Sequence, residues 1–143
     1  MPIPNDDANR PVKLHYPNGW VEEYTYDAEG NLIKTVDIDP FQLYNKTPSI
    51  KFEYTYDAEG NVTHEFQRDS DAVENKKSHT DYTYDALNRL TGSTRKLEIY
   101  PYNTLSYTYT YDTLGNLLQE AGPTTKDLDT YQYNDLNQMT AKR

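Results

Sequence analysis

One motif recurs five times along this chain, and it restricts the fold more than any other feature of the sequence. Each copy contains two tyrosines separated by one residue, then Asp or Asn, two variable residues, Gly or Asn, a polar residue, and an aliphatic residue or Met. The Asp or Asn positions are Asp27, Asp57, Asp85, Asp112 and Asn134, which gives spacings of 30, 28, 27 and 22 residues. A repeat of this length predicts a series of similar supersecondary units that pack side by side.

Each copy of the motif predicts a β-hairpin. The residue between the two tyrosines is Thr or Gln, so the residues alternate with the period of a strand. The fourth residue of the turn, counted from the Asp or Asn, is Gly or Asn, the residue types that adopt positive φ most readily. We therefore predict a type I turn followed by a residue in the left-handed region. The predicted turn residues are Asp27, Gly30, Asp57, Gly60, Asp85, Asn88, Asp112, Gly115, Asn134 and Asn137.

The turn also fixes the register of each hairpin. With a three-residue loop, the second tyrosine of each copy faces the aliphatic residue or Met across the hairpin, and both lie on one face. The predicted pairs are Tyr26–Leu32, Tyr56–Val62, Tyr84–Leu90, Tyr111–Leu117 and Tyr133–Met139. The same face is expected to include a Phe52–Phe66 pair, whereas the opposite face is expected to be polar. The predicted aromatic face comprises Trp20, Tyr24, Tyr26, Tyr54, Tyr56, Tyr82, Tyr84, Tyr109, Tyr111, Tyr131 and Tyr133.

The predicted fold is all-β: a repetitive antiparallel meander of about eleven strands that forms a curved sheet strip, without significant helix. Further hairpins are expected at Asn18-Gly19, around residues 101–104 and around residues 122–125, and long polar loops at 39–49 and 69–78. A bulge or break is expected near Gly92-Ser93. We divide the chain into a flexible N-terminal segment, residues 1–11, and a repeat sheet, residues 12–143. Because one face is apolar and no helix covers it, we expect the sheet to curl or to associate with itself.

Composition agrees with this prediction only because of tyrosine. Leu, Ile, Val and Phe together make up 25 of 143 residues and the mean hydropathy is −1.01, values that on their own favour disorder. The 15 tyrosines, ten of them in the repeated pairs, supply the apolar surface for burial that the few aliphatic residues do not provide. The formal net charge of −9 disfavours binding to nucleic acid or to an anionic membrane surface. No segment resembles a membrane helix or a signal peptide.

The sequence contains no pattern that predicts catalysis, a cofactor or a metal site. Cysteine is absent, which excludes disulfides, thiol nucleophiles and Cys-ligated zinc. His15, His64 and His79 lie in different units without ligand spacing, so we interpret them as surface or strand-filling residues. The segment from Asp69 begins like a calcium loop but has Val73 at its fifth position and lacks the required Gly. No nucleophile elbow or phosphate-binding loop occurs, so we predict no enzyme activity.

The repeated segment from Tyr24 to Leu32 and its four counterparts resemble the YD repeats of the RHS/YD-repeat family. The resemblance covers roughly residues 12–143 and includes the way that Tyr16-Pro17-Asn18-Gly19 leads into the first unit. In that family the repeats form a long sheet that spirals into a hollow shell. The shell encloses a toxic polypeptide in bacterial polymorphic toxins and toxin complexes, and a related shell occurs in teneurins, which are adhesion proteins. The family's shell-closing motif is missing, since Gly does not follow Asp39-Pro40-Phe41.

The resemblance implies a non-catalytic, structural role. It implies a segment of a shell and not a whole shell, because five units are too few to enclose a cavity. It implies a secreted or cell-surface location within a larger parent protein, and contact with neighbouring repeats or with a second copy through the sheet edges. The alternative is a binding module that holds a carbohydrate or a protein on its aromatic face or at its edges. Exposure of the aromatic side chains distinguishes the two hypotheses, since a binding strip leaves them open to solvent.

Overall fold

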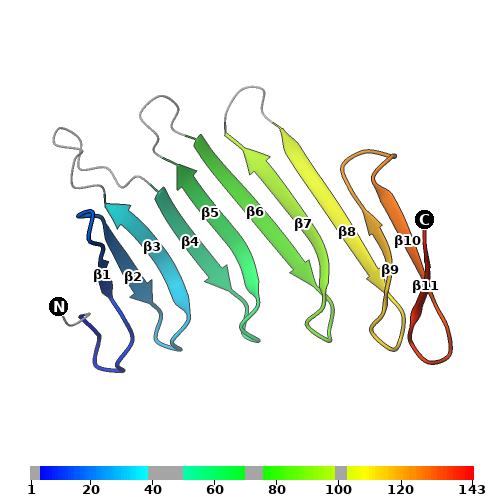
Figure 1. Cartoon of the computed structure of the whole chain (residues 1–143), viewed down its shortest axis with the longest axis horizontal. Coiled ribbons are helices and arrows are strands. Elements are labelled where there is room, and N and C mark those ends of the chain that lie inside the picture. The colour runs from blue at the N-terminus through cyan, green and yellow to red at the C-terminus, as the bar shows by residue number, and fades with distance from the viewer. Residues whose placement is uncertain (1–3, 39–49, 70–75, 99–102) are drawn as a thin grey trace.

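A computed structural model describes residues 4–38, 50–69, 76–98 and 103–143, and these form a single open antiparallel sheet (Figure 1). Each strand pairs with its neighbours in the chain, in the order β1 to β11. The strands are β1 (Lys13–His15), β2 (Val21–Tyr26), β3 (Leu32–Ile38), β4 (Ile50–Tyr56), β5 (Val62–Asp69), β6 (Lys76–Tyr84), β7 (Leu90–Leu97), β8 (Thr104–Tyr111), β9 (Leu117–Ala121), β10 (Leu128–Tyr133) and β11 (Met139–Lys142).

The all-β prediction is confirmed. The described ranges contain eleven strands and no helix, and so no helix there that could span a bilayer.

The β1–β2 hairpin turns through Gly19, whose φ is 88°. The hairpin expected around residues 101–104 joins the paired strands β7 and β8, although most of its turn lies outside the described residues. The expected loop at 39–49 also lies outside them. Part of the loop expected at 69–78 is strand instead, because β5 ends at Asp69 and β6 begins at Lys76.

The turn geometry and the tyrosine pairing are confirmed in all five units. Gly30, Gly60 and Gly115 have φ values of 96°, 86° and 93°, and Asn88 and Asn137 have φ values of 60° and 58°. The second tyrosine of each unit pairs across its hairpin as predicted: Tyr26 with Leu32, Tyr56 with Val62, Tyr84 with Leu90, Tyr111 with Leu117 and Tyr133 with Met139.

The predicted Phe52–Phe66 pair is wrong, because each of the five repeat hairpins contains a β-bulge next to the second tyrosine of its pair. In the second hairpin, Tyr56 pairs with Val62 but Thr55 pairs with His64, so Thr63 is the extra residue. Beyond the bulge the register is shifted by one, and Phe52 faces Gln67 while Phe66 faces Glu53. The bulge expected near Gly92-Ser93 lies at Thr91, one residue earlier, and is one of five such bulges.

The two faces of the sheet differ in exposure as the motif predicts. The tyrosines of the five pairs and Trp20 are half-buried, whereas Thr25, Thr55, Thr83, Thr110 and Gln132 on the opposite face are exposed. We call these the tyrosine face and the threonine face. Directly opposite residues share a face, so the bulges also bring Glu65 and Glu120 onto the tyrosine face, opposite Tyr54 and Tyr109. In the described part of the chain no apolar residue is fully buried, and the two buried residues are Ser78 and Thr80.

A sixth copy of the turn precedes the first tyrosine pair. The Asp6 backbone N–H donates to the Arg10 carbonyl, the Asn9 N–H donates to the Asp6 carbonyl, and Asn9 has a φ of 61°. The Asp6 carboxylate accepts from the backbone of Ala8 and Arg10. This turn lies before the boundary expected at residue 12, and the repeat motif does not predict it because no Tyr-x-Tyr precedes Asp6.

Candidate functional site

The most regular region of the molecule is the side of the sheet where the Asp turns connect the ends of consecutive strands (Figure 1). We call it the turn edge, as distinct from the edge strands β1 and β11. In the second turn, Asp57 Oδ1 accepts hydrogen bonds from the backbone N–H groups of Glu59 and Asn61 at 3.1 and 2.8 Å. Its Oδ2 accepts from Asn61 Nδ2 at 3.0 Å. The backbone N–H of Gly60 donates to the Asp57 carbonyl. The carboxylate therefore satisfies backbone donors that the loop leaves unpaired.

The hydrogen bonds received by these aspartates lower their pKa. The side-chain amide of Asn61 is the largest cause at Asp57, and that of Asn116 is the largest cause at Asp112. At Asp85 the largest cause is the backbone N–H of Arg89. At Asp27 desolvation raises the pKa, but the hydrogen bonds from Asn31 and the loop backbone outweigh it. The turn carboxylates thus stay ionised as acceptors.

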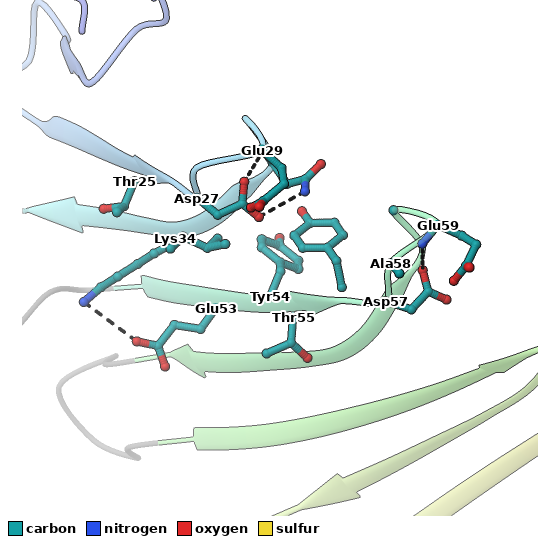
Figure 2. Close-up of a pocket in the computed structure, with 14 residues that line it drawn as sticks. Thr25, Asp27, Glu29, Lys34, Glu53, Tyr54, Thr55, Asp57, Ala58 and Glu59 are labelled. Atoms are coloured by element: carbon teal, nitrogen blue, oxygen red, sulfur yellow. Dashed lines mark hydrogen bonds and ion pairs between the residues drawn. The ribbon is translucent and has the colours of Figure 1, made fainter. Parts of the chain in front are cut away.

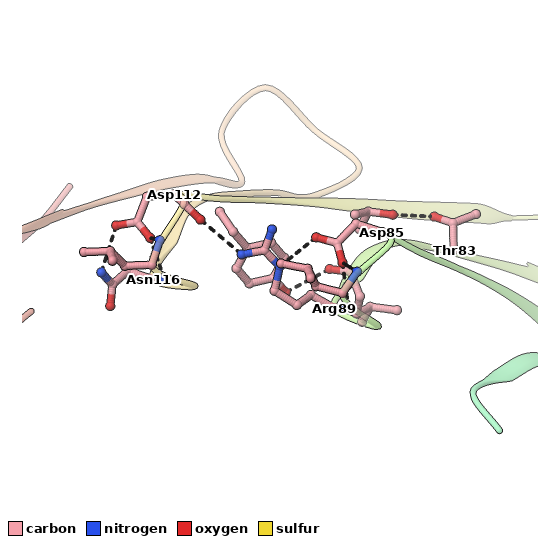
Figure 3. Close-up of polar contacts among 10 residues, drawn as sticks. Thr83, Asp85, Arg89, Asp112 and Asn116 are labelled. Carbon is pink, nitrogen blue, oxygen red and sulfur yellow. Dashed lines mark hydrogen bonds and ion pairs between the residues drawn. The ribbon is translucent and has the colours of Figure 1, made fainter. Parts of the chain in front are cut away.

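Two arginines connect a turn to the unit that follows it. Arg89 Nε donates to Asp85 Oδ2 at 2.6 Å, and Arg89 Nη1 donates to the Asp112 carbonyl of the next turn at 3.0 Å (Figure 3). Its guanidinium lies 4.8 Å from the Tyr111 ring centre. Arg10 bonds Asp6 at 2.7 Å and lies 4.5 Å from the Tyr26 ring in the same way. An asparagine takes this place in other turns: Asn61 donates to Asn88 at 2.9 Å and Asn116 donates to Asn137 at 3.2 Å.

The second tyrosine of each pair joins its unit to the preceding one. Between β3 and β4 the paired residues end at Lys34 and Glu53, short of the turns, so Leu32 is not paired with a backbone partner on β4. The Tyr56 hydroxyl donates to that carbonyl at 2.6 Å. The same bond recurs in every unit: Tyr26 to Pro11 at 3.0 Å, Tyr84 to Val62 at 2.8 Å, Tyr111 to Leu90 at 2.8 Å and Tyr133 to Leu117 at 2.9 Å. We call these five bonds the tyrosine bridges.

The first tyrosine of each pair is partly buried. Burial is the largest cause that raises the pKa of Tyr24, Tyr54, Tyr82 and Tyr109, with nearby carboxylates as further causes. The ring of Tyr54 stacks on Phe52, with the ring centres 6.3 Å apart. These side chains remain neutral phenols over the physiological pH range.

A hollow of about 1040 Å³ lies at the turn edge between the β2–β3 and β4–β5 hairpins (Figure 2). Thr25, Lys34, Glu53 and Thr55 line one part of it, and the Asp27 and Asp57 turns line another. Lys34 and Glu53 form an ion pair of 3.7 Å across it. The hollow is broad and open, and the carboxylates of its two turn aspartates already accept hydrogen bonds from their own turns.

The structure brings together two histidines that the sequence gives no reason to pair. His64 of β5 and His79 of β6 lie diagonally across adjacent strands, with His64 Nε2 3.3 Å from His79 Nδ1. His64 Nδ1 lies 2.7 Å from Asp81 and His79 Nε2 lies 2.8 Å from Glu98. Only the β5–β6 register reveals this contact. His15 lies apart in β1. Within the described ranges no group of three or more His, Cys, Asp and Glu residues is arranged to hold a metal ion.

The comparisons with known proteins agree with the architecture. Residues 6–39, from the N-terminal turn to just beyond β3, match the RHS repeat family model. This match confirms the resemblance to the RHS/YD-repeat family. No curated protein sequence matches the chain.

Two solved structures show the same fold. One is the holotoxin pore of the Photorhabdus luminescens Tc toxin, with 21% identity and a TM-score of 0.79 over 98% of this chain. The other is TcdB2-TccC3 without its hypervariable C-terminal region, with 23% identity and a TM-score of 0.77 over 96% of this chain. This chain spans only 8% of the length of each of those chains. At this level of identity the likeness shows the fold of the sheet.

Proposed function

We propose that this chain, which contains an RHS repeat, is a non-catalytic structural segment of a β-shell. Its role is to extend a sheet by adding similar units edge to edge. The observation that carries the proposal is the set of five tyrosine bridges, which link each unit to the one before it and can continue beyond the ends of this sheet. The residues with this structural role are the turn aspartates and asparagines and the tyrosine pairs.

The absence of a fully buried apolar residue in the described ranges supports the same proposal. A sheet one layer thick leaves its tyrosine face half-exposed, so a second layer or a closed shell is needed to cover it. In this proposal the repeat sheet, residues 12–143 with the Asp6 turn before it, is part of a larger secreted or cell-surface protein. Its partners are neighbouring repeats or a second copy.

The free edge of β11 is where the sheet would be extended. Arg143 exchanges both backbone hydrogen bonds with Thr130 of β10. In an antiparallel ladder the adjacent residue, Lys142, then directs its own N–H and C=O away from β10. Such unpaired groups accept a further strand.

Sedimentation velocity over a range of concentrations tests the proposal. We expect the wild-type chain to self-associate and Lys142→Pro to weaken this association, because proline removes the outward N–H. Lys142→Ala is the matched control. It loses the same ion pair with Asp129 and the same contact with the Tyr131 ring, but it keeps the N–H. A wild-type chain that stays monomeric at every concentration would contradict the proposal and favour the glycan-binding alternative, which titration with oligosaccharides would then test.

A further inference from the structure

The pair of histidines on β5 and β6 has a geometry that the structural role does not use. His64 and Asp81 are direct cross-strand partners, as are Phe66 and His79. The ring of Phe66 lies 4.8 Å from that of His79 and restricts its orientation. The His64 and His79 side chains are 34% and 33% exposed, so solvent reaches both rings.

The neighbouring carboxylates determine which ring nitrogens carry hydrogen. An ionised carboxylate only accepts hydrogen bonds, so His64 Nδ1 and His79 Nε2 donate to Asp81 and Glu98. The second oxygen of each carboxylate faces a lysine, Lys96 at 3.9 Å from Asp81 and Lys77 at 3.6 Å from Glu98.

In two neutral rings the remaining nitrogens, His64 Nε2 and His79 Nδ1, both present lone pairs and lie 3.3 Å apart. Two lone pairs at this distance repel unless a cation lies between them. Zinc–nitrogen bonds of about 2.0–2.1 Å at a tetrahedral angle place two ligand nitrogens about 3.3–3.4 Å apart. Metal-bound histidines also characteristically donate their other N–H to a carboxylate.

We propose that His64 and His79 form a cross-strand site for a divalent transition-metal ion of the zinc class. Imidazole nitrogens suit Zn²⁺, Ni²⁺ and Cu²⁺ better than the hard ions Mg²⁺ and Ca²⁺. The two histidines are the protein ligands and water completes the coordination, because no third protein ligand lies in the described ranges in a position to bind. Asp81 and Glu98 are positioning residues that fix the two ring tautomers.

Calorimetric titration of the full chain with ZnCl₂ tests the site, with MgCl₂ as the hard-ion control. We expect one Zn²⁺ per chain in the wild type and in His15→Gln, which removes the third histidine. His64→Gln and His79→Gln should each weaken binding by more than about tenfold, and Asp81→Asn by about tenfold. Ring ¹⁵N spectra should show Zn²⁺-dependent shifts at His64 Nε2 and His79 Nδ1, and these readouts do not depend on self-association.

Two results would overturn the proposal. One is the same Zn²⁺ affinity in the wild type, His64→Gln and His79→Gln. The other is a wild type that does not bind Zn²⁺. Ring spectra with one proton shared between the two nitrogens would then account for their separation of 3.3 Å. Circular dichroism of each variant would establish that a loss of binding is not a loss of folding.

Discussion

The turn edge and the body of the sheet, by which we mean the strand residues beyond the bulges, differ in how strictly they repeat. At the turn edge every unit has Gly or Asn with positive φ at the same turn position, a bulge at the same place and the same tyrosine bridge. In the body, the residue opposite the first tyrosine changes from Thr35 to Glu65, Ser93 and Glu120. The repeat therefore has constant backbone geometry at the turns. In the body the residue types differ between units, and this variation includes the histidine pair.

The largest effect is expected where the turn edge restricts the backbone. Gly60 has a φ of 86°, and a Cβ built there would meet no atom within 4 Å. Gly60→Val should therefore destabilise the fold by more than about 1 kcal/mol through conformation alone, because β-branched residues resist this region. Urea unfolding measures the change.

Asn88→Gly is the control for this prediction. Asn88 has a φ of 60°, a conformation that glycine also adopts readily. The substitution therefore causes no backbone strain and loses only the exposed hydrogen bond from Asn61, so it should cost less than Gly60→Val. If Gly60→Val were as mild as Asn88→Gly, positive φ would not be what the repeat preserves.

The second prediction compares two tyrosines on one strand. Tyr56→Phe leaves the Leu32 carbonyl without its hydroxyl donor and should cost about 1 kcal/mol. Tyr54→Phe should stay within about 0.5 kcal/mol, because the Tyr54 hydroxyl donates to no neighbouring unit in the described residues. Both are measured by urea unfolding. Equal losses would show that the bridge adds nothing beyond the burial of a ring.

The difference between the two regions also explains which features of the fold could be predicted from the sequence. The turns and the tyrosine pairing were predictable because local residue preferences, Gly or Asn at positive φ and Asp as acceptor, determine them. The Phe52–Phe66 error arose because the bulge at Thr63 depends on neither residue type nor hydrophobic period, and one extra residue moves every later side chain to the other face.

The tyrosine bridges and the histidine pair were also not predictable from the sequence, but for a different reason. Each depends on which residues of two separate hairpins lie side by side, and the loops between hairpins vary in length. The Tyr56 bond to Leu32 spans 24 residues and the contact of His79 with His64 spans 15. A repeat predicts that neighbouring units pack, but only the inter-hairpin register identifies the atoms that meet.

The third prediction uses pH to separate the two regions. Hydrogen bonds lower the pKa of Asp57, so its contribution to stability is present above the unfolded pKa of about 3.9 and is lost as pH falls through the lower folded value. Burial, then the charge of Glu22, raises the pKa of Asp37 in the body. Its contribution has the opposite sign and is lost as pH rises through the folded value.

Urea unfolding at pH 7 and pH 3 measures both effects. Asp57→Asn should make stability less sensitive to acid, and Asp37→Asn should remove a penalty at pH 7. If both substitutions changed the pH dependence in the same direction, the electrostatic difference between turn edge and body would be refuted.

The smallest effect is expected at the turn tips, where the units themselves differ. The third turn residue is Glu29 or Glu59 in the first two units but leucine in the last three, and Leu87, Leu114 and Leu136 are 69%, 72% and 77% exposed. Leu114→Glu should change the unfolding free energy by less than about 0.5 kcal/mol, because an exposed side chain loses little packing. Since we place association at the edge strands, it should also leave the sedimentation profile of the chain unchanged. If Leu114→Glu abolished self-association while Lys142→Pro did not, the contact between copies would lie along the leucine tips, and the turn edge would be an assembly surface as well as a backbone scaffold.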